Sequence, residues 1–215
     1  MRLPLIATRC KKPAMKSTAT SKPAASAQPD SVRPEGHPVV PARKIGVLLV
    51  NLGTPDGTDY WSMWRYLREF LSDPRVIELN KAIWYPILYG LVLTTRPQKS
   101  GANYRKIWNT AKDESPLRTI TRAQSEALAT AFKDQPEIIV DWGMRYGSPS
   151  IKEVVERMEA RGVDRLLTVP LYPQYSATTT ATANDKLLRS PSYKLRAPAV
   201  RSVPPYYDDP AYIEA

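Results

Sequence analysis

Short apolar runs alternate along this sequence with longer segments that have helical periodicity. The first run, residues 45–50, is continuous and rich in β-branched side chains, which is typical of a strand buried on both faces of a parallel sheet. Similar runs at 138–140 and 166–169 predict two further strands. Because helical segments separate these runs, the sequence predicts an α/β fold in which helices flank a parallel sheet.

Three segments carry apolar positions at helical spacing. The first helix is expected to begin after Thr58 or Asp59, either of which can cap it, and to end before Pro74. The second is expected at 121–132, and the third is expected to open at Ser148 and Pro149 and to end at Gly162. The expected buried faces are Trp61, Trp64, Leu67, Phe70 and Leu71 in the first helix, Ala123, Ala127, Leu128 and Phe132 in the second, and Ile151, Val154, Val155 and Met158 in the third.

The charge is concentrated at the N-terminus. The chain has a formal net charge of +10, and residues 1–44 hold nine basic and two acidic side chains but no aromatic one. Such a composition cannot bury enough apolar surface to offset its ordering entropy, so residues 1–43 are predicted to form a disordered basic tail. The tail also resembles a transit peptide in composition, but it lacks the apolar run of a secretory signal. Since the remainder is only mildly basic, no nucleic-acid partner is expected.

The counts of cysteine and histidine limit the metal chemistry. The chain has one cysteine, which excludes a disulfide framework, a CxxC zinc site and an iron–sulfur cluster held by this chain alone. Its one histidine, His37, lies in the predicted tail, so a cage of several histidines is excluded. Any metal chemistry must therefore depend on carboxylates, on a substrate's own ligands or on residues that this chain lacks. The chain itself is expected to hold no cofactor.

Five prolines between 190 and 210 predict a connector that follows a lobe at 44–190. A helix is expected to start near Asp209 and Pro210, and the sequence ends at Ala215 where this helix should gain length. The expectation at this point is that the sequence is a fragment.

Three predicted loops follow the strands, at 51–57, 142–147 and 172–180. In open α/β sheets ligands bind at the carboxyl ends of the strands, so these loops are the expected ligand edge. The first loop lacks the glycine spacing of a phosphate-binding loop, which argues against a nucleotide. The third combines tyrosines with a run of hydroxyl side chains, although a helix cap explains part of that pattern as well.

Residues 82–93 form a run of twelve uncharged residues that is too short to span a bilayer. The run fits a core helix, a patch on a membrane surface, or the wall of a pocket for a flat hydrophobic ligand. Arg96 follows it and could bind a carboxylate, with neutral hydrogen bonds from Tyr104 and Ser115. Taken singly, each of the three also fits an ordinary surface or capping role.

Six motifs together resemble ferrochelatase, the enzyme that inserts ferrous iron into protoporphyrin IX to form protohaem in haem biosynthesis. They lie in the family's order at residues 47–55, 95–97, 104–107, 114–117, 143–146 and 172–176. The resemblance covers residues 44–215 and implies a lyase whose fold has two similar α/β lobes, of which this chain holds the first and, at 191–215, the start of the second.

The resemblance also implies porphyrin-binding positions. Leu52 would contact the macrocycle, Arg96, Tyr104 and Ser115 would hold its propionates, and Arg145 and Tyr146 would lie near the metal path. The cleft floor would be formed by Tyr172, Pro173, Gln174, Tyr175 and Ser176. Residues 82–93 would form an apolar lip with peripheral membrane contact, on a cytoplasmic protein. The spacing between Tyr104 and Ser115 is longer than in short bacterial members of the family.

The family's metal-handling histidine and glutamate belong to the second lobe, beyond Ala215. No catalytic or metal-ligating residue is therefore assigned in this chain, and ferrous iron is expected only as a substrate. We expect the chain alone to be inactive, because removing a pyrrole proton needs a positioned base. The alternatives are a porphyrin or haem carrier, which tight protoporphyrin binding would favour, and a sugar- or nucleotide-binding module, which would need phosphate-cradling glycines.

Overall fold

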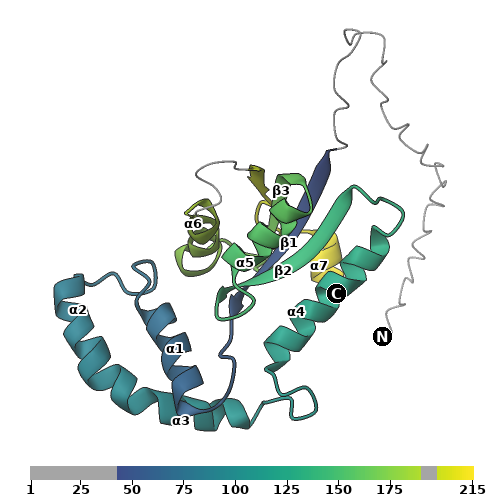
Figure 1. Cartoon of the computed structure of the whole chain (residues 1–215). Helices are drawn as coiled ribbons and strands as arrows, with labels where there is room; N and C mark the ends of the chain where they lie inside the picture. Colours follow the sequence, from purple (N-terminus) through teal and green to yellow (C-terminus); the bar gives the residue numbers. More distant parts are fainter. Residues whose placement is uncertain (1–42, 190–197) are drawn as a thin grey trace, which may run out of the picture. The chain divides into compact units, whose positions relative to one another are not determined.

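A computed structural model describes residues 43–189 and 198–215 (Figure 1). The predicted tail, including His37, lies outside the described residues except for its last position, Arg43.

The sheet has four parallel strands in the order β2-β1-β3-β4. They are β1 (Lys44–Gly53), β2 (Ile138–Tyr146), β3 (Val163–Pro170) and β4 (Ala199–Ser202). The parallel α/β fold and its three expected strands are confirmed. The expected loop starts at 51 and 142 are wrong, because Gly53 pairs with Tyr146 and the two strands stay paired beyond their apolar runs.

β4 was not expected, since it lies within the proline-rich segment predicted as a connector. It pairs with β3 from Arg165↔Ala199 to Thr168↔Ser202, so the sheet of the first lobe extends beyond residue 190. The expected helix start is confirmed by α7 (Pro210–Glu214), where the Asp209 side chain accepts a hydrogen bond from the Ala211 amide. That 191–215 begins a second lobe stays a prediction, and residues 190–197 lie outside the described ranges.

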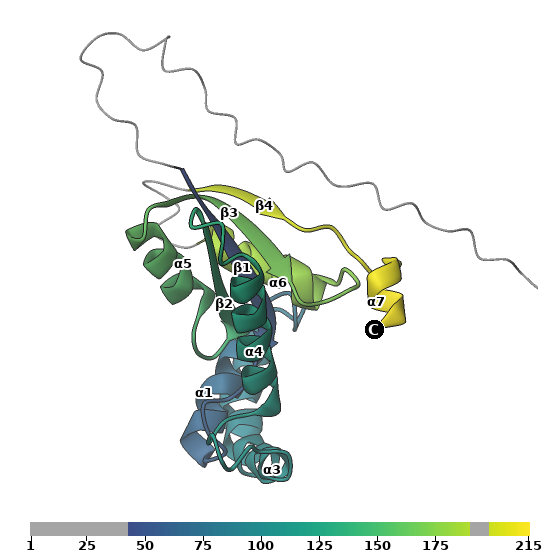
Figure 2. The same ribbon diagram turned by 90° about the vertical axis from the view of Figure 1, so that its right-hand side faces the viewer.

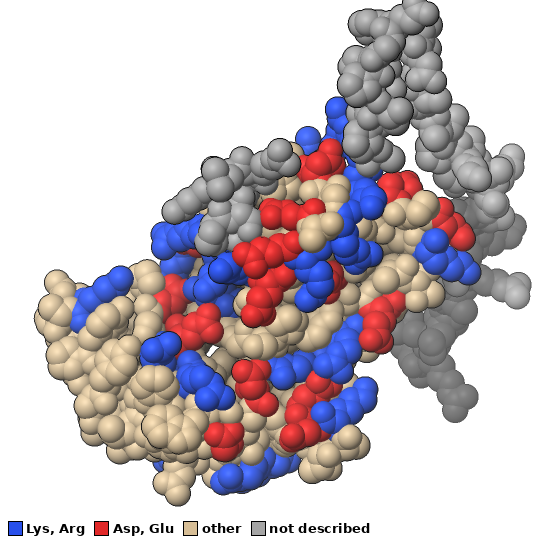
Figure 3. Space-filling view, viewed as in Figure 1, with Lys and Arg blue, Asp and Glu red and all other residues tan. Residues whose placement is uncertain are grey.

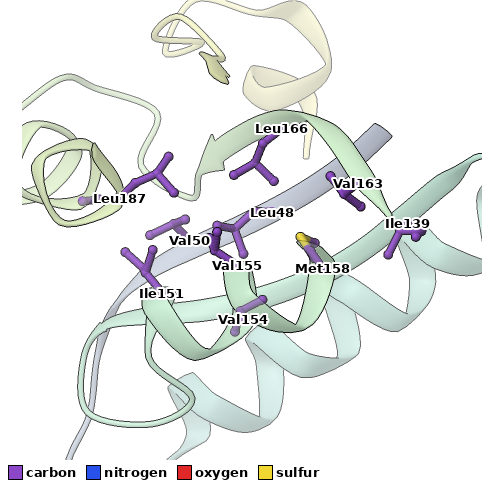
Figure 4. Packing of buried hydrophobic residues seen from close by; sticks show 11 residues of the cluster. Leu48, Val50, Ile139, Ile151, Val154, Val155, Met158, Val163, Leu166 and Leu187 are labelled. Atoms are coloured by element: carbon purple, nitrogen blue, oxygen red, sulfur yellow. The ribbon is translucent and has the colours of Figure 1, made fainter. Parts of the chain in front are cut away.

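One face of the sheet is covered by α5 (Ile151–Ala160) and by α6 (Thr182–Leu188), which continues the π-helical turn η3 (Ala177–Ala181). All four α5 side chains expected in the core are buried there against Leu48, Val50 and Leu166 (Figure 4). The helix is capped by Ser150 in a capping box rather than by Ser148, and Gly162 follows its end at a φ of +86°, as a helix-terminating glycine does.

The opposite face is covered over β1 and β2 by α4 (Pro116–Ala131) (Figure 2). The expected buried face of this helix is wrong: Thr121 and Ser125 are buried, whereas Ala123 and Ala127 are exposed. Polar residues can occupy the buried side because Thr121 is hydrogen-bonded. Its hydroxyl donates to the Leu117 carbonyl oxygen and accepts from the Asn51 amide.

The remaining helices extend from the carboxyl edge of the sheet. The helix α1 (Tyr60–Leu71) is capped by Asp59, as expected, but Trp61 is 63% exposed, and Ser62 and Met63 take the buried positions. After α1 come α2 (Lys81–Ile87), the π-helical turn η2 (Leu88–Val92) and α3 (Leu93–Arg105), and α3 packs against α1. Within the described ranges, no helix is long and apolar enough to cross a membrane.

Candidate functional site at the carboxyl edge of the sheet

The carboxyl ends of β2, β1 and β3 lie side by side, as the sequence predicted for the ligand edge. Gly53 at the end of β1 pairs with Tyr146 at the end of β2, and Val50 pairs with Pro170 of β3. Leu52 follows Val50 by two residues, and Tyr172 follows Pro170 by two residues. The structure therefore brings three of the predicted site residues, Leu52, Tyr146 and Tyr172, to one edge.

Arg145 and Tyr146 are held by Asp73, which follows α1. One oxygen of Asp73, Oδ2, accepts hydrogen bonds from Arg145 Nη2, from the Thr182 hydroxyl and from the Tyr146 hydroxyl, the last at 2.8 Å. Arg145 Nε also donates to Thr182 Oγ1 at 2.7 Å, and Arg145 Nη1 lies 3.7 Å from Glu69 Oε1. We call Glu69, Asp73, Arg145, Tyr146 and Thr182 the Asp73 cluster. It fixes the end of β2 to α1 and α6.

The Asp73 cluster keeps its carboxylate charged despite burial. Burial alone would raise the pKa of Asp73, but the hydrogen bonds from Thr182, from the Arg75 amide and from Tyr146, together with the charge of Arg145, lower it below its usual value. Asp73 therefore acts as a permanent acceptor at neutral pH. Sequence analysis missed Asp73, Glu69 and Thr182, because a carboxylate beside a proline and a threonine in a hydroxyl run carry no local signal of this pairing.

A row of aromatic rings links the edge of the sheet to α3. The ring centroids lie 6.4 Å apart for Tyr104 and Tyr66, 6.2 Å apart for Tyr66 and Phe70, and 5.1 Å apart for Phe70 and Tyr146. Tyr104, from the predicted set, is thus joined to Tyr146 through two α1 residues that were not assigned to the site. Their i, i+4 spacing in a predicted helix is the signal that could have found them.

Three phenols at this edge, those of Tyr66, Tyr146 and Tyr172, keep their protons. Burial is the largest cause that raises the pKa of Tyr66, followed by Tyr104, and burial also raises the pKa of Tyr172. Burial raises the pKa of Tyr146 to about 12, against the opposing effect of its hydrogen bond with Thr182. At neutral pH these side chains can therefore act as neutral hydrogen-bond groups and as apolar ring surface, but not as bases.

Arg96 and Ser115 are not part of the Asp73 cluster or of the aromatic row. Arg96 is exposed on α3 and lines a separate hollow of about 480 Å³, together with Thr95, Lys99, Ser100 and Asn103. Ser115 is buried and caps α4, where its hydroxyl accepts a hydrogen bond from the Arg118 amide at 3.2 Å. This confirms the capping role considered for Ser115, and a role with propionate stays a prediction.

The segment 172–176 runs outward from β3. Tyr172 is half-buried and its hydroxyl is enclosed without a hydrogen-bond partner, whereas Gln174 and Tyr175 are exposed. The Pro173 carbonyl oxygen accepts a hydrogen bond from the Tyr206 amide at 2.9 Å, and Ser176 caps η3 through the Thr178 amide. The helix-cap explanation is therefore confirmed for Ser176.

A cavity of about 590 Å³ opens beside the Asp73 cluster. Its wall combines Asp73 and Arg145 with Tyr85 and Tyr89 from the helical segment that follows α1. In Figure 3 acidic and basic side chains intermix over the centre of the visible face, whereas uncharged surface spreads over α1 and α2. The cavity thus lies between a charged, hydrogen-bonded cluster and an aromatic surface.

The described residues hold no group of three or more histidine, cysteine, aspartate or glutamate side chains that could bind a metal ion. What the edge offers is ring surface, neutral phenols and a fixed guanidinium. These are groups suited to holding a large apolar ring with polar substituents.

Comparisons with known proteins identify relatives of this chain. A sequence model of the family described as Ferrochelatase matches residues 44–215. The ferrochelatase of Mesorhizobium japonicum is 72% identical over 180 residues, which are 84% of this chain and 51% of that protein. Those of Chelativorans sp. (63% over 182 residues, 85% and 52%) and Agrobacterium fabrum (60% over 185 residues, 86% and 54%) are similar. The chain spans about half the length of the curated relatives it matches, and it belongs to the ferrochelatase family.

Proposed function

We propose that this chain contributes the porphyrin-holding half of an enzyme that inserts ferrous iron into protoporphyrin IX. The observation that carries this proposal is the common edge of the sheet, to which the ends of β1, β2 and β3 bring Leu52, Tyr146 and Tyr172, in a chain of the ferrochelatase family. The aromatic row from Tyr146 to Tyr104 supports it, because a flat macrocycle needs an extended apolar and aromatic wall.

Within this proposal, Arg96 and Tyr104 bind the propionates from α3. They stand eight residues apart, which is about 12 Å along a helix axis and places them on neighbouring sides of it. Arg96 is exposed and makes no ion pair within the described residues, so its guanidinium can receive a carboxylate without breaking a bond. Ser115, Arg145 and residues 173–176 complete the proposed set, with Ser115 acting from the cap of α4.

The purified chain 1–215 is expected not to insert iron above the uncatalysed rate. Insertion requires removal of pyrrole protons, and the tyrosines at the edge retain their own protons at neutral pH. The measurement is the anaerobic formation of protohaem from ferrous iron and protoporphyrin IX, followed by absorbance. Formation of protohaem faster than in the protein-free control would refute the proposed inactivity of this half alone.

Replacing Arg96 with alanine is expected to weaken protoporphyrin binding by about tenfold, because the variant loses the binding free energy of one charge-assisted hydrogen-bonded pair. Quenching of tryptophan fluorescence during titration of the chain gives the dissociation constants. Arg105→Ala is the matched control, because Arg105 is an exposed arginine at the end of the same helix. Equal affinities of the Arg96→Ala and Arg105→Ala variants would show that Arg96 is not part of the binding site.

We also propose that this chain is cytoplasmic and that it contacts a membrane surface through α2 and η2, where Ile83 and Leu91 are 63% and 62% exposed. Such exposed apolar side chains on a helix can enter the interface region of a bilayer. Sedimentation with phosphatidylglycerol vesicles tests this contact. Equal sedimentation of the chain and of an Ile83→Asp, Leu91→Asp variant would exclude it.

A further inference from the structure

The helix α1 carries aromatic side chains on two of its sides. Tyr66 and Phe70 belong to the aromatic row that ends at Tyr146. Trp64 and Arg68 each precede one of these two residues by two positions, and two positions correspond to about 200° around an α-helix. The side of α1 with Trp64 and Arg68 therefore points away from the row that is proposed to hold the porphyrin.

On this second side, three rings and a guanidinium lie close together. The ring centroids are 6.4 Å apart for Trp64 and Tyr89 and 6.0 Å apart for Tyr89 and Tyr85. The guanidinium carbon of Arg68 lies 5.2 Å from the centroid of the Trp64 ring. Tyr85, Tyr89 and Arg68 line the cavity of about 590 Å³ beside the Asp73 cluster, which we call the Tyr89 cavity. Because Tyr89 is 44% exposed, its ring offers free surface to a flat ligand.

The Tyr89 cavity is distinct from the proposed porphyrin site. Leu52, Tyr104 and Tyr172 are absent from its wall. Arg145 is the one described residue that the wall shares with the proposed porphyrin-binding set, and its guanidinium is already bound to Asp73. The volume is within the range of sites that bind small molecules. The cavity can therefore hold a ligand of its own.

The wall of the Tyr89 cavity carries a net positive charge. Among the described residues, five basic and three acidic side chains line it. The basic ones are Arg68, Arg145, Lys152, Lys186 and Arg189. A concave surface with an excess of one charge raises the local concentration of ions of the opposite charge. The cavity therefore favours an anion, in addition to a flat ring.

The three carboxylates that line the cavity are already engaged by hydrogen bonds. Asp73 accepts three such bonds within the Asp73 cluster. Asp185 Oδ2 accepts a hydrogen bond from Arg75 Nε at 2.6 Å. Glu69 Oε2 accepts one from the Gly147 amide at 3.1 Å. These carboxylates therefore neutralise the basic side chains of the wall only in part.

The basic side chains, in contrast, are held loosely. Arg68 forms no ion pair with another residue in 43–189 or 198–215. The amine nitrogens of Lys186 and Lys152 and a guanidinium nitrogen of Arg189 lie 3.6, 3.8 and 4.0 Å from the carboxylate oxygens beside them, which is longer than a hydrogen bond. Exposed pairs of this kind contribute little free energy. An incoming anion can therefore recruit these cations at small cost.

We propose that the Tyr89 cavity is a second ligand site, which binds a nucleotide with its base against Tyr89 and its phosphates on Arg68 and Arg189. A nucleotide combines the two properties that the wall selects, a flat aromatic ring and a group with several negative charges. Guanidinium groups bind phosphate oxygens in pairs, and every base can stack on an aromatic side chain. Side chains here take the part that the backbone of a glycine-rich loop has in other nucleotide sites.

The test is isothermal titration of the full chain 1–215 with ATP, in the absence of iron and porphyrin. We expect one ATP per chain, bound about tenfold or more tightly than adenosine or tripolyphosphate, because each of these probes lacks one of the two recognised groups. The Arg68→Gln, Arg189→Gln variant and the Tyr89→Ala variant should each weaken ATP binding by about tenfold or more. Since no iron insertion is measured, failure of this test is distinguishable from failure of the proposed reaction.

The matched control is Arg105→Gln, Arg161→Gln, which removes the same charge from two exposed arginines that do not line the cavity. It should leave the ATP affinity within about twofold of the unaltered chain, because salt screens distant exposed charges. Thermal unfolding verifies that all variants fold. Absence of saturable ATP binding, or equal affinities of the two double variants, would overturn the proposal. So would tripolyphosphate binding as tight as ATP binding, which would leave a site for anions only, and displacement of bound protoporphyrin by ATP, which would place the nucleotide at the porphyrin edge.

Discussion

Replacement of Asp73 with alanine is expected to lower the free energy of unfolding by about 3–5 kcal/mol, the usual cost of breaking a buried ion pair from one side. The variant leaves the Arg145 guanidinium, the Thr182 hydroxyl and the Tyr146 hydroxyl without their shared acceptor. Tyr146 is fully buried, so water cannot replace the lost bond. Urea denaturation followed by tryptophan fluorescence measures the difference in the free energy of unfolding between the variant and the unaltered chain.

The control for Asp73 is Asp56→Ala, which removes the partner of Arg118 in a more exposed ion pair. Such surface pairs contribute about 0–1 kcal/mol, so the Asp56 variant should remain close to the unaltered chain. A loss at Asp73 no larger than the loss at Asp56 would contradict the central role of the Asp73 cluster.

The contribution of Asp73 to the free energy of unfolding is expected to decrease at low pH. The pKa of Asp73 is lower in the folded chain than in the unfolded chain, where it is about 3.9. Its stabilising contribution is therefore complete above about pH 4 and is lost as the pH falls through the lowered folded-state value. The difference in stability between the unaltered chain and Asp73→Asn should shrink over that interval and stay constant between pH 5 and pH 8, since other acidic groups are common to both proteins.

The sequence was sufficient for those parts of the fold that follow from local periodicity. The run at 45–50 and the spacing of Ile151, Val154, Val155 and Met158 predicted the central strand and the buried face of α5. Periodicity failed for α4, because Thr121 is buried through a hydrogen bond to Asn51, seventy positions away. It also failed for β4, whose four residues are held by pairing with β3 and have no apolar run of their own.

In the candidate site, too, local sequence patterns predicted some features, whereas long-range contacts could not be predicted. Tyr146 and Tyr172 could be placed at one edge from the strand pattern alone, since parallel strands end at the same side of a sheet. The partners of Arg145 could not be found in this way. Asp73 and Thr182 are separated by more than a hundred residues and come into contact only in the folded chain. Pairings of this kind depend on packing between α1, β2 and α6, for which a single sequence carries no signal.

Replacement of Gly53 with alanine is expected to cost about 4 kcal/mol or more, a loss seen only where a defined structural feature is broken. Gly53 has a φ of +114°, a conformation that alanine rarely adopts, and a Cβ atom there would lie 1.8 Å from the Tyr146 carbonyl oxygen. The clash is with backbone, so no side chain can move aside. Relief requires β1 and β2 to separate at the edge where Leu52 and Tyr146 lie. The expected result is a urea unfolding transition with its midpoint at a lower urea concentration.

Gly90→Ala provides the contrast, because a Cβ atom at Gly90 would meet nothing within 4 Å and the position is helical. Alanine is favoured over glycine in helices by up to about 1 kcal/mol, so this variant should be neutral or slightly more stable. The two substitutions add the same methyl group, and only their surroundings differ. If Gly53→Ala unfolded at the same urea concentration as Gly90→Ala, the close approach of β1 to the Tyr146 backbone could not be what sets the geometry of the ligand edge. The large loss expected at Gly53 therefore measures directly how strongly the strand ends are held together where the porphyrin is proposed to bind.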